Sequence, residues 1–307
     1  MLEPVMFTGG VYKHDLVIEL VEDLGGYLLQ KNVTQSEVIL LLLVPAEDLR
    51  ILEDLTKELR GELTRAPLAG TEVAVVTPTL AIHHLPHTAC DIAEYLRRNG
   101  AKSNMIGLAR GVGREIAQIN EYETALINEH DAAVFIFGNF AKCIIKKEEL
   151  YKGINIPVVV TGGPEIPKGE MPYAFEYVSS VGRIAHRSKK ATEIGNLDRI
   201  VAAVGRALDK MRADIEKDPL TTSPPRVMDA VREQVPDIER SYSPLPIALN
   251  LNGCRIKLPY EDYHEAIGAV RFDEGVTLKE IAKIVPSKMK NYTLVRILPE
   301  SETGMVF

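Results

Sequence analysis

Two kinds of hydrophobic periodicity alternate along the first 68 residues of this chain. Short apolar runs predict strands, and apolar residues at helical spacing, for example Leu16, Leu20 and Leu24, predict amphipathic helices. In chain order, the predicted elements are a strand at 5–7, a turn at 9–10, a helix at 14–24, strands at 27–33 and 37–44, a helix at 46–60 and a strand at 62–65. This is the order βαββαβ of a ferredoxin-like unit, so residues 1–68 are predicted to form an α+β domain.

From about residue 69 the pattern changes to buried strands that alternate with helices. In chain order, we expect a strand at 73–77, a helix at 89–99, a strand at 103–108, a helix at 113–129, a strand at 132–137, a helix at 142–150, strands at 157–161 and 177–178, and a long helix at 197–216. Strands that alternate with helices imply right-handed crossovers and a parallel sheet covered on both faces. Residues 69–216 are therefore predicted to form a Rossmann-like α/β domain.

The last part of the chain predicts a small α+β domain behind a linker. Residues 217–226 are rich in Pro, Ser and Thr and show no periodicity, which is typical of a linker. Residues 227–307 follow with a helix at 227–234, a hairpin turn at 250–255, a strand at 254–258, a helix at 278–285 and a strand at 292–298. The fold class is thus α/β: a ferredoxin-like unit, a parallel-sheet unit and a small α+β tail.

Composition narrows the classes of function that fit this fold. The 307 residues are 46% hydrophobic, which is typical of a globular protein, and their net charge of −7 argues against nucleic acid and anionic membrane surfaces as partners. The longest apolar run is too short to span a membrane, and the start of the chain lacks the features of a secretory signal. The three cysteines lie far apart, so we expect reduced thiols in a cytoplasmic protein.

The strongest chemical signal is residues 83–90, His-His-Leu-Pro-His-Thr-Ala-Cys, at a predicted strand-to-helix turn. Thiolate and imidazole are the usual protein ligands of zinc and of iron–sulfur clusters, and the positive end of a helix dipole favours a thiolate. Cys90, His87 and His84 are therefore candidate metal ligands. The spacing matches no zinc-finger or ferredoxin motif, so ordinary packing of Cys90, with the histidines bonded to loop carbonyls, stays open.

A second turn lies at the same predicted edge of the sheet. Gly138 and Asn139 follow the strand at 132–137, and Cys143 comes shortly after them. Because the carboxyl ends of parallel strands meet at one edge, Cys143 could converge with Cys90 there as a further metal ligand, and Gly138 and Asn139 could bind a cofactor. The alternative is that Cys143 is an ordinary core residue of a helix.

A third turn carries glycines and arginines between a predicted strand and a helix. Backbone N–H groups at a helix start favour an anion, and arginine side chains add charge. The candidate anion ligands are Arg110, Gly111, Gly113 and Arg114. No P-loop follows, so these glycines could equally serve only to form the turn, as we expect for Gly162 and Gly163; Cys254 is expected to be structural.

Four segments of the chain resemble the methanogenesis marker protein 7 family. They are MFTGGVYKH at 6–14, APLAGTE at 66–72, TLAIHHLPH at 79–87 with Cys90 after it, and NMIGLARGVG at 104–113. The middle domain is also similar to the C protein of the methyl-coenzyme M reductase operon, through Cys90 at the helix entry and the Gly138-Asn139 turn.

These resemblances imply a role in a methanogenic archaeon. Such proteins look like subunits, without catalytic activity of their own, of the ATP-dependent assembly that activates methyl-coenzyme M reductase by delivering low-potential electrons through iron–sulfur clusters to reduce the nickel of coenzyme F430 to Ni(I). Cys90 with His87, and His84 or Cys143, would hold a cluster. The implied partners are the reductase, operon protein C, other marker proteins and an ATPase. The rival interpretation is a metal-free regulatory protein that binds a small anion at Arg110 to Arg114.

Overall fold

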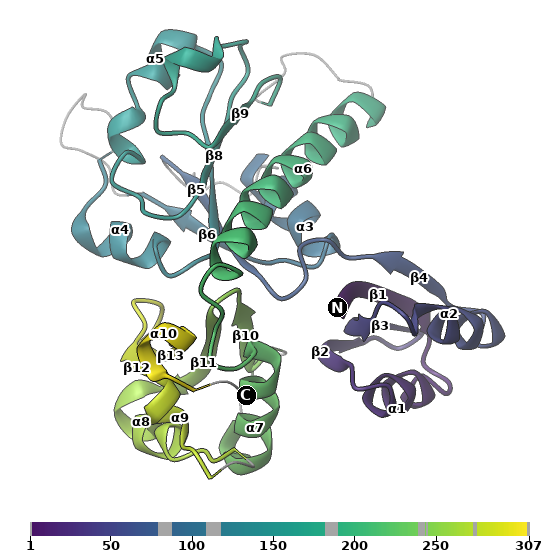
Figure 1. Cartoon of the computed structure of the whole chain (residues 1–307). Coiled ribbons are helices and arrows are strands. Elements are labelled where there is room, and N and C mark those ends of the chain that lie inside the picture. The colour runs from purple at the N-terminus through teal and green to yellow at the C-terminus, as the bar shows by residue number, and fades with distance from the viewer. Residues whose placement is uncertain are drawn as a thin grey trace.

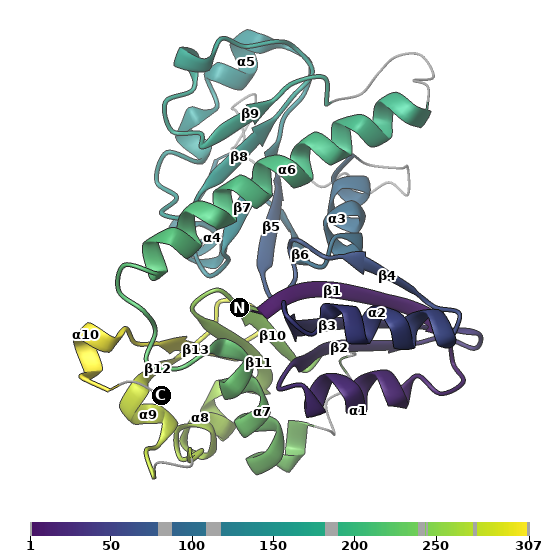
Figure 2. The ribbon, with the colours of Figure 1, turned by 45° about the vertical axis from the view of Figure 1, so that its right-hand side comes forward.

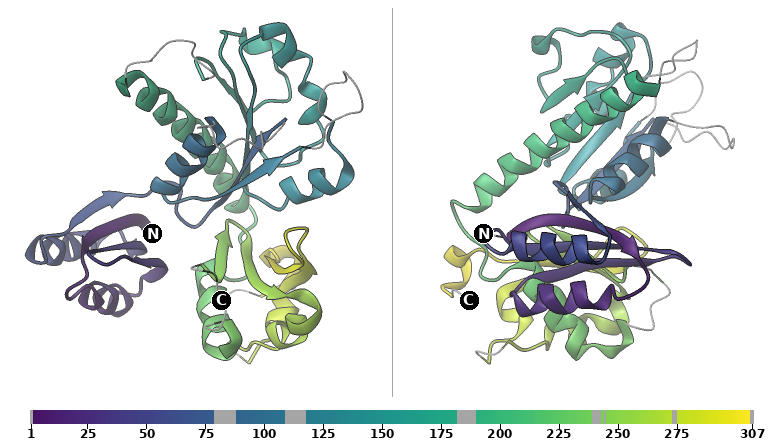
Figure 3. Two further views of the ribbon diagram at one scale, coloured as in Figure 1. Left: turned by 180° about the vertical axis from the view of Figure 1, so that it is seen from behind. Right: turned by 90° about the vertical axis from the view of Figure 1, so that its right-hand side faces the viewer.

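The computed structural model describes residues 2–78, 88–108, 118–181, 190–238, 243, 245–272 and 275–305. The described chain forms an antiparallel N-terminal sheet, a central parallel sheet of five strands and an antiparallel C-terminal sheet, each with its own helices (Figure 1). Seen from behind and from the side, the central unit lies above the N-terminal and C-terminal units (Figure 3). Among the described helices, none is both long enough and apolar enough to cross a membrane.

The N-terminal unit has the predicted order of elements, and its two helices cover one face of its sheet (Figure 2). In chain order they are β1 (Leu2–Gly10), α1 (Asp15–Asp23), β2 (Tyr27–Val33), β3 (Glu37–Pro45), α2 (Leu49–Glu58) and β4 (Glu62–Arg65). The strands lie in the order β2-β3-β1-β4. The turn predicted at Gly9 and Gly10 is wrong, because both glycines still pair with β3 as the end of β1.

Strand β3 is apolar along most of its length because both of its faces are covered. Val38, Leu40 and Leu42 are buried beneath α1 and α2. Leu41 faces the other way and packs, together with Leu29 of β2, into the core of the C-terminal unit. The N-terminal sheet is therefore closed on one side by its own helices and on the other by the C-terminal unit.

The central unit is a parallel sheet in the order β6-β5-β7-β8-β9. Its elements, in chain order, are β5 (Glu72–Thr77), α3 (Thr88–Arg98), β6 (Lys102–Gly107), α4 (Glu121–Ile127), β7 (Ala132–Ile136), α5 (Ala141–Ile145), the 3-10 helices η1 (Glu148–Leu150) and η2 (Lys168–Glu170) on either side of β8 (Val158–Thr161), then β9 (Glu176–Val178) and α6 (Lys190–Ile215). Helices α3 and α6 cover one face, and α4 and α5 cover the other. Strands β5, β7 and β8 are buried at every position, as two covered faces require.

Two helices of the central unit differ from the prediction. Within the described part of the predicted helix 113–129, α4 begins only at Glu121, because Asn120 forms a capping box with Glu123. The helix predicted at 142–150 divides into α5 and η1. Ile144 and Leu150 are six residues apart, yet both are buried in the same core. In one straight helix their side chains would point about 120° apart, so the break between α5 and η1 lets both face the core.

The C-terminal unit is a four-stranded antiparallel sheet in the order β10-β11-β13-β12. Its elements are α7 (Pro224–Gln234), the 3-10 helix η3 (Pro236–Ile238), β10 (Ile247–Asn250), β11 (Gly253–Pro259), α8 (Tyr260–Gly268), α9 (Leu278–Ile281), β12 (Ala282–Pro286), β13 (Tyr292–Ile297) and α10 (Glu300–Thr303). Strands β10 and β11 form the predicted hairpin. The segment predicted as a linker packs on this unit: the Thr221 N–H donates to the carbonyl of Leu298, and Ser223 caps α7.

The helix predicted at 278–285 is wrong beyond Ile281. Helix α9 is a single turn that starts at a capping box between Thr277 and Glu280. The next residues form the edge strand β12, which pairs with β13. Ile284 and Val285 are β-branched and suit a strand, and the neighbouring β13 supplies the hydrogen bonds that decide between the two conformations.

Candidate functional site

The chain order of the central strands creates one topological switch point. After β5 the chain passes to β6 on one side, and it then returns to β7 on the other side of β5. The helices that follow β5 and β7 therefore leave toward opposite faces: α3 packs with α6, whereas α5 packs with α4. In open parallel sheets, ligands bind outside the carboxyl ends of the strands at such a point.

Cys90 lies in the first turn of α3, the helix that leaves this switch point from β5. Ala89 and Ile92 of the same helix are fully buried against the sheet, which fixes the position of the helix. The Cys90 side chain is exposed and forms no disulfide. The structure therefore presents a free thiol just beyond the carboxyl end of β5.

Cys143 lies in α5, the helix that leaves the switch point from β7. Its N–H donates to the carbonyl of Phe140 (2.9 Å), and its neighbour Ile144 anchors the short helix in the core. The Cys143 side chain is exposed and free, so the core position considered for it from the sequence is wrong. The two thiols thus stand on helices that begin on either side of the switch point. In the described ranges, no group of three or more His, Cys, Asp or Glu side chains has the arrangement of a metal site.

Several predicted site residues lie outside the described residues. His84 and His87 fall in the segment 79–87, which connects β5 to α3. Arg110, Gly111, Gly113 and Arg114 fall in the segment 109–117, which follows β6. Their assignment as metal and anion ligands stays a prediction.

The Gly138-Asn139 turn packs tightly against the turn that follows β8. The Gly163 N–H donates to the carbonyl of Gly138 (3.1 Å). A Cβ on Gly163 would lie 2.4 Å from the Asn139 side-chain oxygen, and one on Gly162 would lie 2.5 Å from Ile144. Gly162 and Gly163 therefore allow the two turns to approach, and the role of Gly138 and Asn139 in binding a cofactor stays a prediction.

One buried polar group also lies at this edge. Thr77 is the last residue of β5 and is 1% exposed. Its hydroxyl has no hydrogen-bond partner within the part of the chain that the structure describes. The buried Thr77 hydroxyl thus lies at the carboxyl end of β5, the strand that leads to α3 and Cys90.

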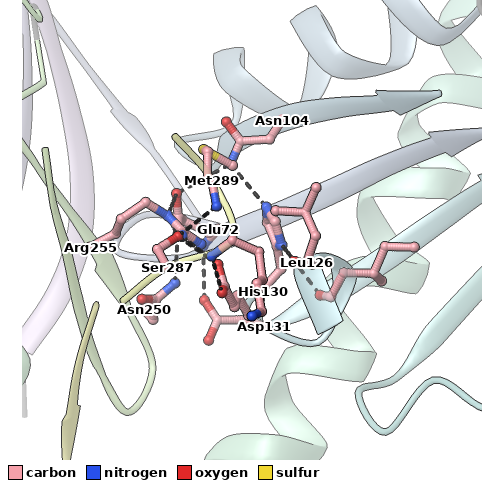
Figure 4. Close-up of polar contacts among 12 residues, drawn as sticks. Glu72, Asn104, Leu126, His130, Asp131, Asn250, Arg255, Ser287 and Met289 are labelled. Carbon is pink, nitrogen blue, oxygen red and sulfur yellow. Dashed lines mark hydrogen bonds and ion pairs between the residues drawn. The ribbon is translucent and has the colours of Figure 1, made fainter. Parts of the chain in front are cut away.

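The amino edge of the same sheet carries a buried network of charged residues that the sequence analysis missed (Figure 4). Arg255 of β11 is 0% exposed. Its Nε donates to Glu72 Oε2 (3.0 Å), and its Nη1 donates to Glu129 Oε2 (2.7 Å). The network joins the central sheet to the C-terminal sheet.

Glu72 is the centre of this network. Asn250 donates to one of its oxygens (2.9 Å) and Asn104 to the other (3.2 Å). Burial alone would raise the pKa of Glu72, but the Arg255 guanidinium and these hydrogen bonds outweigh burial and lower it. Glu72 is therefore held as a buried carboxylate.

Asp131 links the same two units through the backbone. Its Oδ2 accepts from the N–H of Glu72 (2.8 Å), and its Oδ1 accepts from the N–H of Leu251 (2.9 Å), in the turn between β10 and β11. Burial raises the pKa of Asp131 to about 7, against the opposing influence of these hydrogen bonds and of Arg296. This carboxyl group consequently titrates near neutral pH.

His130 and Cys254 are structural members of this region. Asn104 Nδ2 lies 3.0 Å from His130 Nε2, and His130 Nδ1 lies 3.0 Å from the carbonyl of Leu126. The amide donor and the carbonyl acceptor assign the proton to Nδ1, in accord with a pKa that burial lowers. For the Cys254 thiol, whose charged form is the anion, burial acts in the other direction and raises the pKa to about 12. A thiol that stays protonated suits the structural role expected for it.

One signal in the sequence could have revealed this network. Glu72 is the first residue of β5 and is followed by four apolar residues, and Asp131 stands immediately before the wholly apolar strand β7. Arg255 interrupts the buried strand β11. Charged residues at such positions need buried partners.

Comparison with known protein families decides where the chain belongs. The family model of the methyl-coenzyme M reductase operon protein C matches residues 2–270. The chain belongs to this family. The predicted membership of the methanogenesis marker protein 7 family is therefore wrong. The resemblance to operon protein C, which the sequence analysis limited to the middle domain, also includes the N-terminal unit and most of the C-terminal unit.

One similar protein comes from Methanocaldococcus jannaschii. It is 46% identical to this chain over 302 residues, covering 98% of this chain and 96% of the relative, and is itself described as an uncharacterized protein. The match spans all three units, so they occur together in both proteins. The family match does not test a separate operon protein C as a partner, which stays a prediction.

Similarity to solved structures is low. A glutamyl-tRNA reductase from Methanopyrus kandleri is 10% identical, with 78% of this chain and 86% of that chain covered and a TM-score of 0.23. A formyltetrahydrofolate deformylase from Pseudomonas putida is also 10% identical, with 67% and 57% covered and a TM-score of 0.25. Nothing about the function of this chain follows from scores of this size.

Proposed function

We propose that this protein is a non-catalytic subunit of the ATP-dependent assembly that activates methyl-coenzyme M reductase. The observation that carries the proposal is the match to the reductase operon protein C family over residues 2–270. In this role the protein helps deliver low-potential electrons that reduce the nickel of coenzyme F430 to Ni(I). A partner ATPase hydrolyses the ATP, since the sequence has no P-loop. The reductase and methanogenesis marker proteins are the other proposed partners.

The proposal includes an iron–sulfur cluster at the carboxyl edge of the central sheet. Cys90 and Cys143 are free, exposed thiols on helices that begin on either side of the switch point, and thiolates are the usual ligands of such clusters. A cluster takes about four protein ligands, so two thiols fit only part of one. His84, His87 or side chains of a partner would complete it.

The exposure of both thiols supports a site that is shared with a partner. A ligand set held within one chain is normally enclosed by that chain, which controls solvent access and the local dielectric. Cys90 and Cys143 instead face outward. A docked partner would bury them and supply the missing ligands.

Reconstitution of reductase activation tests this function. Inactive methyl-coenzyme M reductase is incubated anaerobically with ATP, a low-potential reductant, the ATPase and marker proteins, with and without this chain. We expect methane formation only when the chain is present. Equal activation without the chain would contradict the proposed role.

A further inference from the structure

The N-terminal unit carries almost the whole net charge of the protein. Residues 1–68 contain twelve Asp and Glu but only six Lys and Arg, which gives −6 of the total −7. The other 239 residues are therefore nearly neutral as a set. Such a strong asymmetry between parts of one chain is an electrostatic feature that can steer association.

The structure concentrates this charge on one outward surface. Helices α1 and α2 lie side by side on the outer face of the N-terminal unit (Figures 2 and 3). We define the acidic helix face as their exposed acidic residues with those of the turn before α2: Asp15, Glu19, Glu22, Asp23, Glu47, Glu53, Asp54 and Glu58. Ion pairs within the described chain reach only Asp15, through Lys31 and His14, and Asp54, through Lys57.

Two exposed aliphatic side chains lie within this acidic helix face. Leu16 is 41% exposed and shares a helical stripe with Glu19 and Asp23, three and seven residues further on. Ile51 is 49% exposed and shares a stripe with Asp54 and Glu58 at the same spacings. About half of each side chain stays exposed in the fold of the chain itself, so another molecule that docks here would bury the rest.

The other broad face of this unit is already occupied. Leu29 and Leu41 on the open side of its sheet are buried in the core of the C-terminal unit. The helices are thus the broad surface through which the N-terminal unit can meet a partner. Negative charge repels nucleic acid and anionic lipid, and it attracts lysine and arginine side chains.

We propose that the acidic helix face docks a protein surface on which Lys and Arg side chains surround an apolar contact for Leu16 and Ile51. This proposal rests on the proposed function in one respect, namely that the chain is a subunit of an assembly. The carboxylates give the association its rate and its salt dependence, and the two aliphatic side chains add a buried contact. The site is distinct from the thiol-bearing edge of the central sheet.

Carbodiimide cross-linking of the anaerobically purified assembly tests the proposal. Tagged full-length chain is isolated from a methanogen with its bound proteins, and the reagent joins carboxylates directly to amines. We expect cross-links from Glu19, Glu47 or Glu58 to lysines of another protein. If these carboxylates link only to lysines of the same chain, or if no protein is bound at all, the proposal fails.

Charge-matched variants provide the second measurement on the same assembly. The triple variant Glu19→Gln, Glu47→Gln, Glu58→Gln should weaken the affinity for the cross-linked protein about tenfold at low salt. The control Glu233→Gln, Glu261→Gln, Glu265→Gln changes the same charge on exposed positions of the C-terminal unit and should leave the affinity unchanged. Equal affinities for the two triple variants would overturn the proposal.

Two substitutions of exposed isoleucines test the apolar contribution to binding separately from the contribution of charge. Ile51→Gln should weaken binding, whereas Ile194→Gln should not, because Ile194 is similarly exposed (40%) on α6. Unchanged binding in Ile51→Gln would contradict the apolar part. Reductase activation reports separately on the proposed function, since a chain can dock through this face whether or not activation requires it.

Discussion

At the scale of single residues, Arg255 explains how two sheets far apart in the sequence stay joined. Its guanidinium lies between the carboxylates of Glu72 and Glu129, and all three side chains are withdrawn from water. A buried ion pair of this kind adds little by comparison with a well-packed apolar substitute. Removal of one partner, however, leaves a charge buried without compensation.

Replacement of Arg255 should therefore destabilise the protein strongly. We expect Arg255→Met to lower the free energy of unfolding by about 3–5 kcal/mol, because two buried carboxylates lose their cation. Arg212→Met is the control: Arg212 pairs with the exposed Asp209, and such pairs contribute about 0–1 kcal/mol. Urea denaturation measures both, and similar small losses for the two variants would show that the buried network is not needed for stability.

Asp131 predicts a specific dependence of stability on pH. Its pKa is raised from 3.8 to about 7 in the folded protein, so between these two values the folded state binds a proton that the unfolded state has lost. The contribution of Asp131 to stability is therefore full below about pH 4, falls as the pH rises and is lost above about pH 7. Asp131→Asn removes this titration and should flatten the decline.

Unfolding midpoints in urea at pH 4.5, 6 and 8 measure this effect. The difference between the Asp131→Asn variant and the unchanged protein isolates the contribution of Asp131 from those of other groups. We expect the variant to gain stability relative to the unchanged protein as the pH rises. Parallel pH profiles would mean that Asp131 is not protonated in the fold.

At the scale of elements, the contact between two turns shapes the candidate site. The turn after β7 carries Gly138 and leads to Cys143, and the turn after β8 supports it through Gly162. A Cβ on Gly162 would lie 2.8 Å from the Tyr177 hydroxyl oxygen as well as against Ile144. This support positions α5 and its thiol.

Gly162→Ala should disturb this support. We expect a loss of about 1–3 kcal/mol in the free energy of unfolding, the usual effect of an overpacked methyl group. Gly138→Ala is the matched control in the facing turn, because a Cβ there meets nothing within 4 Å. Thermal denaturation distinguishes them, and an unchanged midpoint for Gly162→Ala would show that the turns separate easily.

The sequence predicted elements well where local pattern decides and poorly where distant partners decide. The βαββαβ order of the N-terminal unit and the parallel central sheet follow from periodicity, and the structure confirms both. The pattern over β12 predicts a helix, and the structure has a strand there because its hydrogen bonds come from β13. For the same reason the partners of Arg255 could not be read from sequence: Glu72 lies 183 residues away.

The candidate site shows the same division. The strand-then-turn pattern correctly located Cys90 and Cys143 after the carboxyl ends of β5 and β7. Exposure of Cys143 depends on α5 ending at Ile145 and on how Ile144 packs, which no local pattern specifies. Only the structure therefore shows that Cys143 lies on the outer surface.

At the scale of the whole molecule, the two surfaces proposed to meet other proteins lie on different units, the central unit and the N-terminal unit. The central sheet carries the thiols at its carboxyl edge and the buried network at its amino edge. The C-terminal unit closes that amino edge and also covers the open face of the N-terminal sheet. The thiols and the acidic helix face consequently remain available for proteins of the proposed assembly.

Iron and sulfide content of the anaerobically purified assembly tests the central claim most directly. We expect both to be present with the unchanged chain and to fall sharply with Cys90→Ser and with Cys143→Ser. The buried thiol variant Cys254→Ala, away from the switch point, should keep them. Full iron and sulfide in the double variant Cys90→Ser, Cys143→Ser, or an iron-free assembly that still activates the reductase, would contradict the account.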